Sequence, residues 1–264
     1  MALAMPSGVL LEICIASPQD AATAEAGGAD RVELNAALEL GGLTPSPGTL
    51  LEARRAVRLP IIAMCRPRSG GFHYSAQEFD VMRQDIDLLL ENGADGIATG
   101  ILHADDSVDL NRCAQLIRQI GPRATQGAVF HRAFDFTADP FRALEELIDL
   151  GFRRVMTSGQ QPAALQGTKL IAELIGRSTG RIEILPAAGI RASNAAEIIS
   201  ATGCTQLHAS LRESRSDASV AARSTINLGG DPSTADDANG TYRATSPRLL
   251  AEMVESLRKY GRAS

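Results

Sequence analysis

Two short apolar runs near the start of the chain each carry polar side chains two residues apart. The first run contains Glu12 and Cys14, and the second contains Glu33 and Asn35. Side chains alternate between the two faces of a strand, so each pair shares one face if these runs are strands. The residues that alternate with them are apolar and suit a layer of helices. We therefore expect these four side chains to point into the interior of the fold.

Ionised carboxylates are costly inside a protein unless they are paired, so Glu12 and Glu33 need cationic partners. Arg66 ends the third apolar run and Arg68 follows two residues later. These two arginines are the predicted partners.

His131 and His208 lie in two later apolar runs. Carboxylates, imidazoles and arginines in one pocket would serve an acid–base enzyme or an anion site, with Glu33 or His131 as the general base. The alternative is that the carboxylates form structural ion pairs and the histidines are hydrogen-bonded core residues. The candidate catalytic residues are Glu12, Glu33, Arg66, His131 and His208.

Further polar residues and glycines stand where other apolar runs end. The turn AAGIR at residues 187–191 is similar to glycine-rich phosphate-binding turns, although a phosphate site usually offers more glycines and a helix N-terminus. The candidate substrate-binding residues are Arg68, Ser158, Gly189, Arg191 and Ser210. Cys65, Cys113 and Cys204 are expected to be small buried apolar residues.

The elements that would position these residues repeat a single unit, an apolar run followed by a helix-like stretch. The predicted strands are 10–16, 31–35, 61–66, 96–101, 128–132, 154–158, 182–187 and 206–210. The predicted helices are around 18–27, 46–57, 75–91, 109–120, 139–149, 161–175 and 193–200. Three helix starts have a capping side chain directly before a proline, at Ser17, Ser46 and Asp139.

Eight strands that alternate with helices favour parallel pairing. The 264 residues divide into about 33 per unit, which is typical of a TIM-like (β/α)8 barrel, an α/β fold formed here by one domain over 1–264. An open doubly wound sheet would usually have a glycine-rich turn after its first strand, which is not found here. In a barrel the chemistry lies at the carboxyl ends of the strands, where the candidate residues fall.

Residues 211–245 do not follow this pattern, because they are rich in Ser, Asp, Ala and Gly. They precede a last amphipathic helix at 247–259 and occupy the position of the final βα loop. We expect this long segment to be irregular, and either a lid or a surface loop without a role.

The composition excludes several classes of protein. The net charge is −5, only 4% of the residues are aromatic, and no apolar run approaches the length of a membrane span. We therefore expect neither nucleic acid nor membrane as a partner. The four cysteines are scattered and no export signal precedes them, which predicts reduced thiols and a cytoplasmic location.

A series of motifs in fixed order closely resembles the CutC family, which is named for copper homeostasis. They are LEICIAS (11–17), GGADRVEL (27–34), GGLTPS (41–46), RPR (66–68), GGF (70–72), TG (99–100), HRAFD (131–135), TSGQ (157–160), AGIR (188–191) and HAS (208–210). The resemblance covers residues 9–260 and implies a TIM-like barrel.

The resemblance also implies a cytoplasmic protein that binds Cu(I) through inward cysteines of the first two strands. Soft Cu(I) prefers thiolate ligands. Cys14 matches the first of these cysteines, but Asn35 stands at the second, and an amide is a poor ligand for Cu(I). Cys14 is thus the candidate metal ligand, with Met64 or an imidazole as a second donor.

Two other hypotheses remain at this point. The first is an enzyme that acts on a small anionic metabolite, such as a sugar phosphate or a carboxylate, by acid–base chemistry. The second is a non-catalytic scaffold. For either one, a homo-oligomer is the default expectation for such a barrel.

Overall fold

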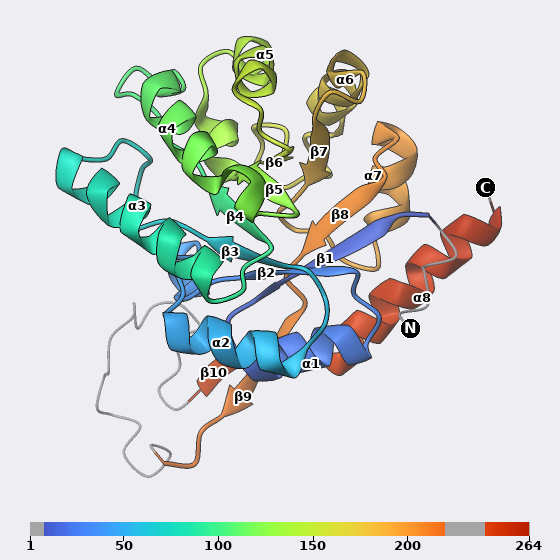
Figure 1. Cartoon of the computed structure of the whole chain (residues 1–264). Helices are drawn as coiled ribbons and strands as arrows, with labels where there is room; N and C mark the ends of the chain where they lie inside the picture. The colour runs from blue at the N-terminus through green and yellow to red at the C-terminus, as the bar shows by residue number, and fades with distance from the viewer. Residues whose placement is uncertain (1–7, 220–240, 264) are drawn as a thin grey trace.

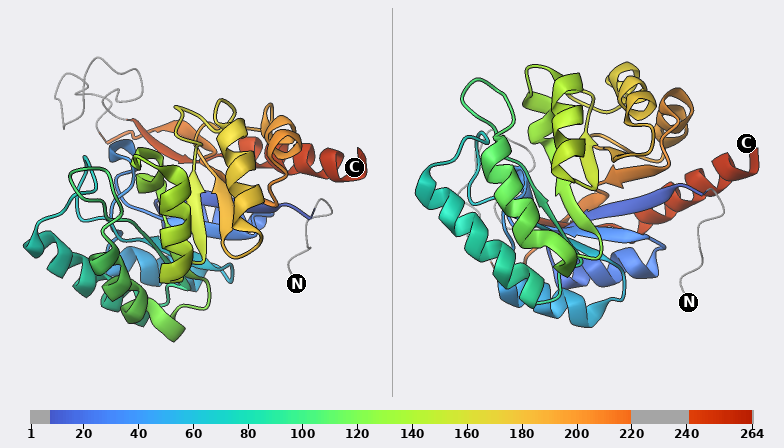
Figure 2. Two further views of the ribbon diagram at one scale, coloured as in Figure 1. Left: turned by 90° about the horizontal axis from the view of Figure 1, so that it is seen from above. Right: turned by 45° about the horizontal axis from the view of Figure 1, so that its top comes forward.

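Eight short parallel strands alternate with helices along the chain. The structure is a computed structural model that describes residues 8–219 and 241–263. The strands are paired in the order β7-β6-β5-β4-β3-β2-β1-β8. Helices surround the strands on the outside (Figures 1 and 2). The predicted TIM-like (β/α)8 barrel is confirmed.

The strands are β1 (Leu10–Ile15), β2 (Arg31–Leu34), β3 (Ile61–Met64), β4 (Gly96–Thr99), β5 (Gly127–Phe130), β6 (Arg154–Thr157), β7 (Glu183–Pro186) and β8 (Gln206–Ala209). The α-helices are α1 (Pro18–Ala26), α2 (Pro47–Ala56), α3 (Ala76–Glu91), α4 (Leu110–Ile120), α5 (Pro140–Leu150), α6 (Thr168–Ser178), α7 (Ala195–Thr202) and α8 (Pro247–Ala263). Short 3-10 helices are η1 (Leu38–Leu40), η2 (Gly121–Arg123) and η3 (Arg132–Phe136).

The helix starts follow the capping signals in the sequence. Ser17 and Ser46 accept hydrogen bonds from the third backbone N–H beyond them, and Asp139 accepts from two N–H groups of α5. α6 begins at Thr168, later than expected, because the backbone at Gly159 folds tightly against Gly167. A Cβ at Gly167 would lie 1.9 Å from a backbone oxygen of the preceding turn.

The segment 211–245 is not irregular at its ends, which corrects the sequence-based expectation. β9 (Arg212–Ser216) pairs with β10 (Thr241–Thr245) in an antiparallel ribbon. The Thr245 N–H donates to Asp20 at 2.7 Å, which attaches the ribbon to α1 (Figure 1). The lid expected from this segment would involve residues 220–240, which lie outside the described residues.

The barrel interior is divided into layers. Buried ion pairs and hydrogen bonds fill the end where the strands begin, and a small apolar cluster lies in the middle. This cluster consists of Ile62, Met64, Ala98, Val129, Met156, Leu185 and Ala187. The larger apolar core lies between the strands and the helices. Polar side chains are therefore separated from the helix layer and concentrated inside the barrel.

β7 and β8 stand at the two ends of the strand order, and side chains link them. The Gln206 amide of β8 donates to Glu183 Oε2 of β7 at 3.3 Å. Arg154 Nε of β6 donates to both Glu183 Oε2 at 2.8 Å and Gln206 Oε1 at 3.1 Å, which reinforces this link. These contacts hold the barrel together where the backbone ladder does not. Among the described residues, no helix is both long enough and apolar enough to cross a membrane.

Candidate functional site

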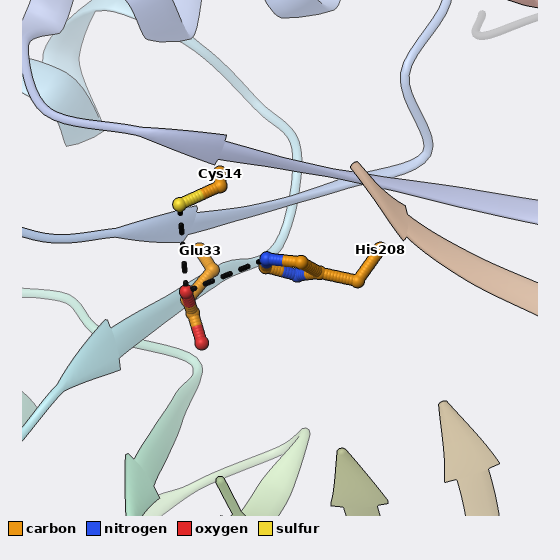
Figure 3. A group of neighbouring side chains, drawn as sticks. All are labelled: Cys14, Glu33 and His208. Atoms are coloured by element: carbon orange, nitrogen blue, oxygen red, sulfur yellow. Dashed lines mark hydrogen bonds and ion pairs between the residues drawn. The ribbon is translucent and has the colours of Figure 1, made fainter. Parts of the chain in front are cut away.

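Three strands bring Cys14, Glu33 and His208 together inside the barrel. Cys14 of β1 is in register with Glu33 of β2, and Glu12, two residues earlier, is in register with His208 of β8. One potential ligand atom from each of Cys14, Glu33 and His208 lies within 4.8 Å of the others. Figure 3 shows the thiol and the imidazole approaching the same Glu33 oxygen, at 3.8 Å and 3.9 Å.

Glu12 lies beneath this cluster and orients the imidazole. Its Oε1 is 2.7 Å from His208 Nδ1, and its other oxygen pairs with Arg31. Burial alone would raise the pKa of Glu12, but the Arg31 charge and the His208 hydrogen bond hold it below its usual value. The ionised carboxylate accepts a hydrogen bond from His208 Nδ1–H, so His208 presents Nε2 toward Cys14 and Glu33.

The protonation of the other cluster residues follows from the same burial and charges. Burial raises the pKa of the Cys14 thiol, and it also raises the pKa of Glu33, to which the Glu12 charge adds. Burial opposes the charge of His208, but the Glu33 charge and hydrogen bonds to Cys14 and Glu12 raise its pKa well above the ordinary value. Burial therefore favours the protonated thiol of Cys14, whereas the neighbouring glutamates favour the protonated imidazole of His208.

Asn35, at the position of the second expected cysteine, contacts both neighbours in the cluster. Its amide nitrogen lies 2.9 Å from Glu33 Oε2 and 3.5 Å from Cys14 Sγ. The amide thus donates hydrogen bonds to the carboxylate and the sulfur. Gly42 makes room for it, since a Cβ there would lie 2.4 Å from Asn35 Oδ1.

The predicted cationic partners of the two glutamates are wrong. Arg66 donates to the backbone carbonyls of Leu40, Gly42 and Gly70, and Arg68 pairs with Glu78 at 2.5 Å. Arg66 extends along the loops at the mouth, too far along its strand to reach the interior carboxylates. Arg31 is the partner of Glu12 instead. This partner could have been predicted from the sequence, because Arg31 is two residues before Glu33 and therefore shares its strand face.

A cavity of about 750 Å³ opens above the cluster. Six of the residues predicted for the site line this cavity. The predicted residues that line it are Cys14, Glu33, Arg66, Arg68, His131 and His208. Glu12 is not among its lining residues. The wall of the cavity also contains residues that were not predicted for the site, among them Phe72, Leu102, Phe136 and Met156.

His131 lines the cavity from the end of β5 as a neutral imidazole. Its Nδ1 accepts a hydrogen bond from the Ala133 N–H at 3.2 Å, and Gly100 leaves space for its ring. Burial, together with the nearby Arg66 charge, lowers the pKa of His131 to about 3. The pKa of His131 is therefore lowered, whereas the pKa of His208 is raised by the carboxylates beside it.

The other predicted substrate-binding residues lie outside this cavity. Ser158 is buried and donates to Asp135 Oδ2 at 2.9 Å. Arg191 and Ser210 line a separate cavity of about 540 Å³, and Gly189 is exposed in the turn after β7. These residues lie at the ends of strands, as predicted, but residues at neighbouring strand ends do not all line the same cavity.

Sequence comparison identifies the group of proteins to which this chain is related. The sequence pattern described as the CutC family matches residues 9–213, which is more than half of the chain. The chain belongs to the CutC family. A family protein CutC from Treponema denticola is 47% identical over 84% of this chain and 89% of its own length. The copper homeostasis protein cutC homolog of Homo sapiens is 39% identical over 95% of this chain and 91% of its own.

Solved structures agree with the CutC assignment. The putative copper homeostasis protein CutC from Streptococcus agalactiae has a TM-score of 0.70 and 32% identity, and covers 76% of this chain and 97% of its own. A thiamine phosphate pyrophosphorylase from Pyrococcus furiosus has a TM-score of 0.56 at 13% identity, over 97% of this chain and 98% of its own. The second likeness concerns the barrel fold alone. The cytoplasmic location, the exclusion of nucleic acid and the homo-oligomer stay predictions.

Proposed function

We propose that this CutC-family chain binds one Cu(I) ion as cargo between Cys14 and His208, with Glu33 beside it. The observation that carries the proposal is the hydrogen bond between His208 Nδ1 and Glu12 Oε1, at 2.7 Å. Metal-binding histidines nearly always donate their second ring N–H to a carboxylate or a carbonyl, which fixes the orientation of the ligating nitrogen. Here that arrangement directs Nε2 toward the only inward thiol of the cluster.

The donor set suits a soft monovalent ion. A thiolate is the preferred ligand of Cu(I), and an imidazole nitrogen is an accepted one. Binding would displace the Cys14 thiol proton and the His208 Nε2 proton to solvent, because metal ligands must be deprotonated. The resulting single thiolate neutralises the single positive charge of Cu(I), which matters in a buried site. Asn35 donates to the sulfur rather than ligating the ion, so it supports Cys14 where a second thiol would have ligated.

A Cu(I) titration tests the proposal. The full chain would be titrated without oxygen against a coloured Cu(I) chelator, alongside Cys14→Ala and the control Cys65→Ala. Cys65 is an equally buried thiol that faces the helices and lies near the Met82 carbonyl, at 3.4 Å. We expect one Cu(I) per chain in the wild type and in Cys65→Ala, and at least tenfold weaker binding in Cys14→Ala. Equal affinity in all three would refute the site.

A gain-of-function variant tests the role of Asn35 separately. Asn35→Cys places a second sulfur next to Cys14, and we expect it to bind Cu(I) at least tenfold more tightly than the wild type. Unchanged affinity would show that Cu(I) does not bind at this position. Thermal unfolding of each metal-free variant would show whether the fold is intact.

A second candidate function is acid–base chemistry on a small anionic metabolite, with Glu33 as the general base. It is favoured by the position of Glu33, whose Oε1 is buried without a hydrogen-bond partner in the wall of the large cavity. Burial raises the pKa of this carboxyl, in the direction that a general base requires. Thermal-shift screening of millimolar carboxylates and sugar phosphates tests it, and stabilisation by none of them would count against it.

A further inference from the structure

Unpaired buried polar atoms are concentrated around the large cavity. Among the described residues, nine buried side-chain nitrogen or oxygen atoms have no hydrogen-bond partner. Four of them belong to residues that line this cavity, namely Glu33 Oε1, Asn35 Oδ1, Arg66 Nε and His131 Nε2. Buried polar groups without partners are costly and usually indicate a missing ligand, ion or water. The last two atoms, Arg66 Nε and His131 Nε2, are nitrogen donors.

Arg66 is a buried charge without a counter-charge. Arg66 is 6% exposed. Within residues 8–219 and 241–263 its guanidinium donates to backbone carbonyls and interacts with the Tyr74 hydroxyl, and none of these partners carries a charge. Arg31, Arg68, Arg132 and Arg154, by contrast, each pair with a carboxylate. A guanidinium stays charged in proteins, and a buried charge is stabilised by an opposite one. An anion from outside the chain would supply it.

His131 offers a second donor next to Arg66. Its Nδ1 accepts the Ala133 N–H, so the ring proton of the neutral imidazole is on Nε2. Phe72 joins the two residues, because its ring centroid lies 5.2 Å from Arg66 Cζ and 5.1 Å from the centre of the His131 ring. The guanidinium and the imidazole therefore both contact Phe72, and the Arg66 charge is close enough to His131 to lower its pKa.

We propose that Arg66 and His131 form a subsite for the carboxylate of a small organic acid. One positive charge and two unpaired N–H donors match the single charge and two oxygens of a carboxylate. A phosphoryl dianion would need more charge and more donors. The rest of the ligand would contact apolar side chains of the same cavity, which include Leu38, Met64, Phe72, Leu102, Phe136 and Met156. Arg68 and Arg191 have no part in this subsite.

This inference gives the second candidate function its substrate class, and it is independent of Cu(I) binding. The experiment below measures carboxylate binding alone. A negative result would therefore refute the carboxylate subsite without bearing on catalysis or on Cu(I) binding.

The experiment follows the Arg66 Nε–H directly. The full chain, labelled with ¹⁵N-arginine, would be titrated with acetate as the minimal carboxylate, with acetamide as its uncharged counterpart, and with inorganic phosphate. Arg66→Lys identifies the Arg66 signal by its loss. Arg68→Lys is the matched control, because Arg68 lines the same cavity but already pairs with Glu78.

A second variant removes the His131 donor and keeps the local structure. His131 caps the helix η3 through Nδ1, and asparagine is a good capping residue that lacks the distal N–H. We expect acetate to shift the Arg66 signal in a saturable way in the wild type and in Arg68→Lys. In His131→Asn the acetate affinity should fall at least tenfold.

Three results would overturn the proposal. They are no saturable shift of the Arg66 signal with acetate, an equal shift with acetamide, and an affinity unchanged by His131→Asn. Tighter binding of phosphate than of acetate would overturn the choice of a carboxylate. Thermal unfolding of His131→Asn at neutral pH would confirm that its loss of binding does not come from unfolding.

Discussion

Replacing Arg31 by methionine should strongly destabilise the barrel. The Arg31 and Glu12 side chains are only 2% and 1% exposed, and the guanidinium also donates to Gln206 Oε1 at 2.9 Å. Methionine fills a similar volume but removes the guanidinium that pairs with the buried Glu12 carboxylate, which keeps His208 as its remaining hydrogen-bonded partner. Removing one partner of a buried ion pair costs about 3–5 kcal/mol. For a chain of this size that corresponds to a decrease of roughly 10 °C in Tm.

A surface pair provides the matched control. Arg55 pairs with Glu52, but these side chains are 73% and 57% exposed, so solvent screens the interaction. Arg55→Met should therefore change the stability little. Urea unfolding of both variants, followed by far-UV circular dichroism, measures the difference in the free energy of unfolding.

The double variant Glu12→Gln/Arg31→Met separates the loss of an ion pair from a loss of packing. Removing the charge of the buried carboxylate should restore at least about 1 kcal/mol relative to Arg31→Met alone, because a neutral amide is less costly to bury than a charge. The reasoning would be refuted if Arg31→Met were as stable as Arg55→Met. It would also be refuted if the double variant were no more stable than Arg31→Met.

Three further predictions follow from the site. Glu12→Gln should weaken Cu(I) binding by about 10–100-fold in the chelator competition, because the amide orients His208 less firmly, and unchanged affinity would contradict the proposed site. Because the folded-state pKa of His131 is about 3 against 6.5 ordinarily, stability should be lost as the pH falls from 6.5 toward 3. Between pH 7 and pH 5 the wild type should therefore lose about 2 kcal/mol more than His131→Asn in urea unfolding, and equal losses would contradict the neutral imidazole. Gly100→Ala should cost about 1–3 kcal/mol, since its Cβ would lie 2.8 Å from the His131 ring. The control Gly176→Ala in α6 meets no atom within 4 Å and should not destabilise the protein.

Much of the architecture follows from local patterns in the sequence. Strand alternation placed Glu12, Cys14, Glu33 and Asn35 inside the barrel, and the structure has them there. The capping residues Ser17, Ser46 and Asp139 also begin their helices as predicted. Such signals act over a few residues, so they are readable without the fold.

The ends of long segments were less predictable. The start of α6 depends on a close approach of two glycine backbones, and the β9–β10 ribbon depends on pairing across the chain. The ribbon strands are short and polar, with no apolar alternation to reveal them. Both features come from contacts between residues far apart or from backbone conformation, which residue types alone do not specify.

The sequence by itself determined which residues face the interior, because alternation along a strand depends only on the neighbouring residues. Only the tertiary structure decided which of them meet. Register between strands put His208 beside Glu12 and assigned Arg31 rather than Arg66 to the buried carboxylate. Loop geometry then left Arg66 among backbone carbonyls at the cavity. Pairing in a barrel depends on distances between strands and on side-chain reach, and these are properties of the folded barrel.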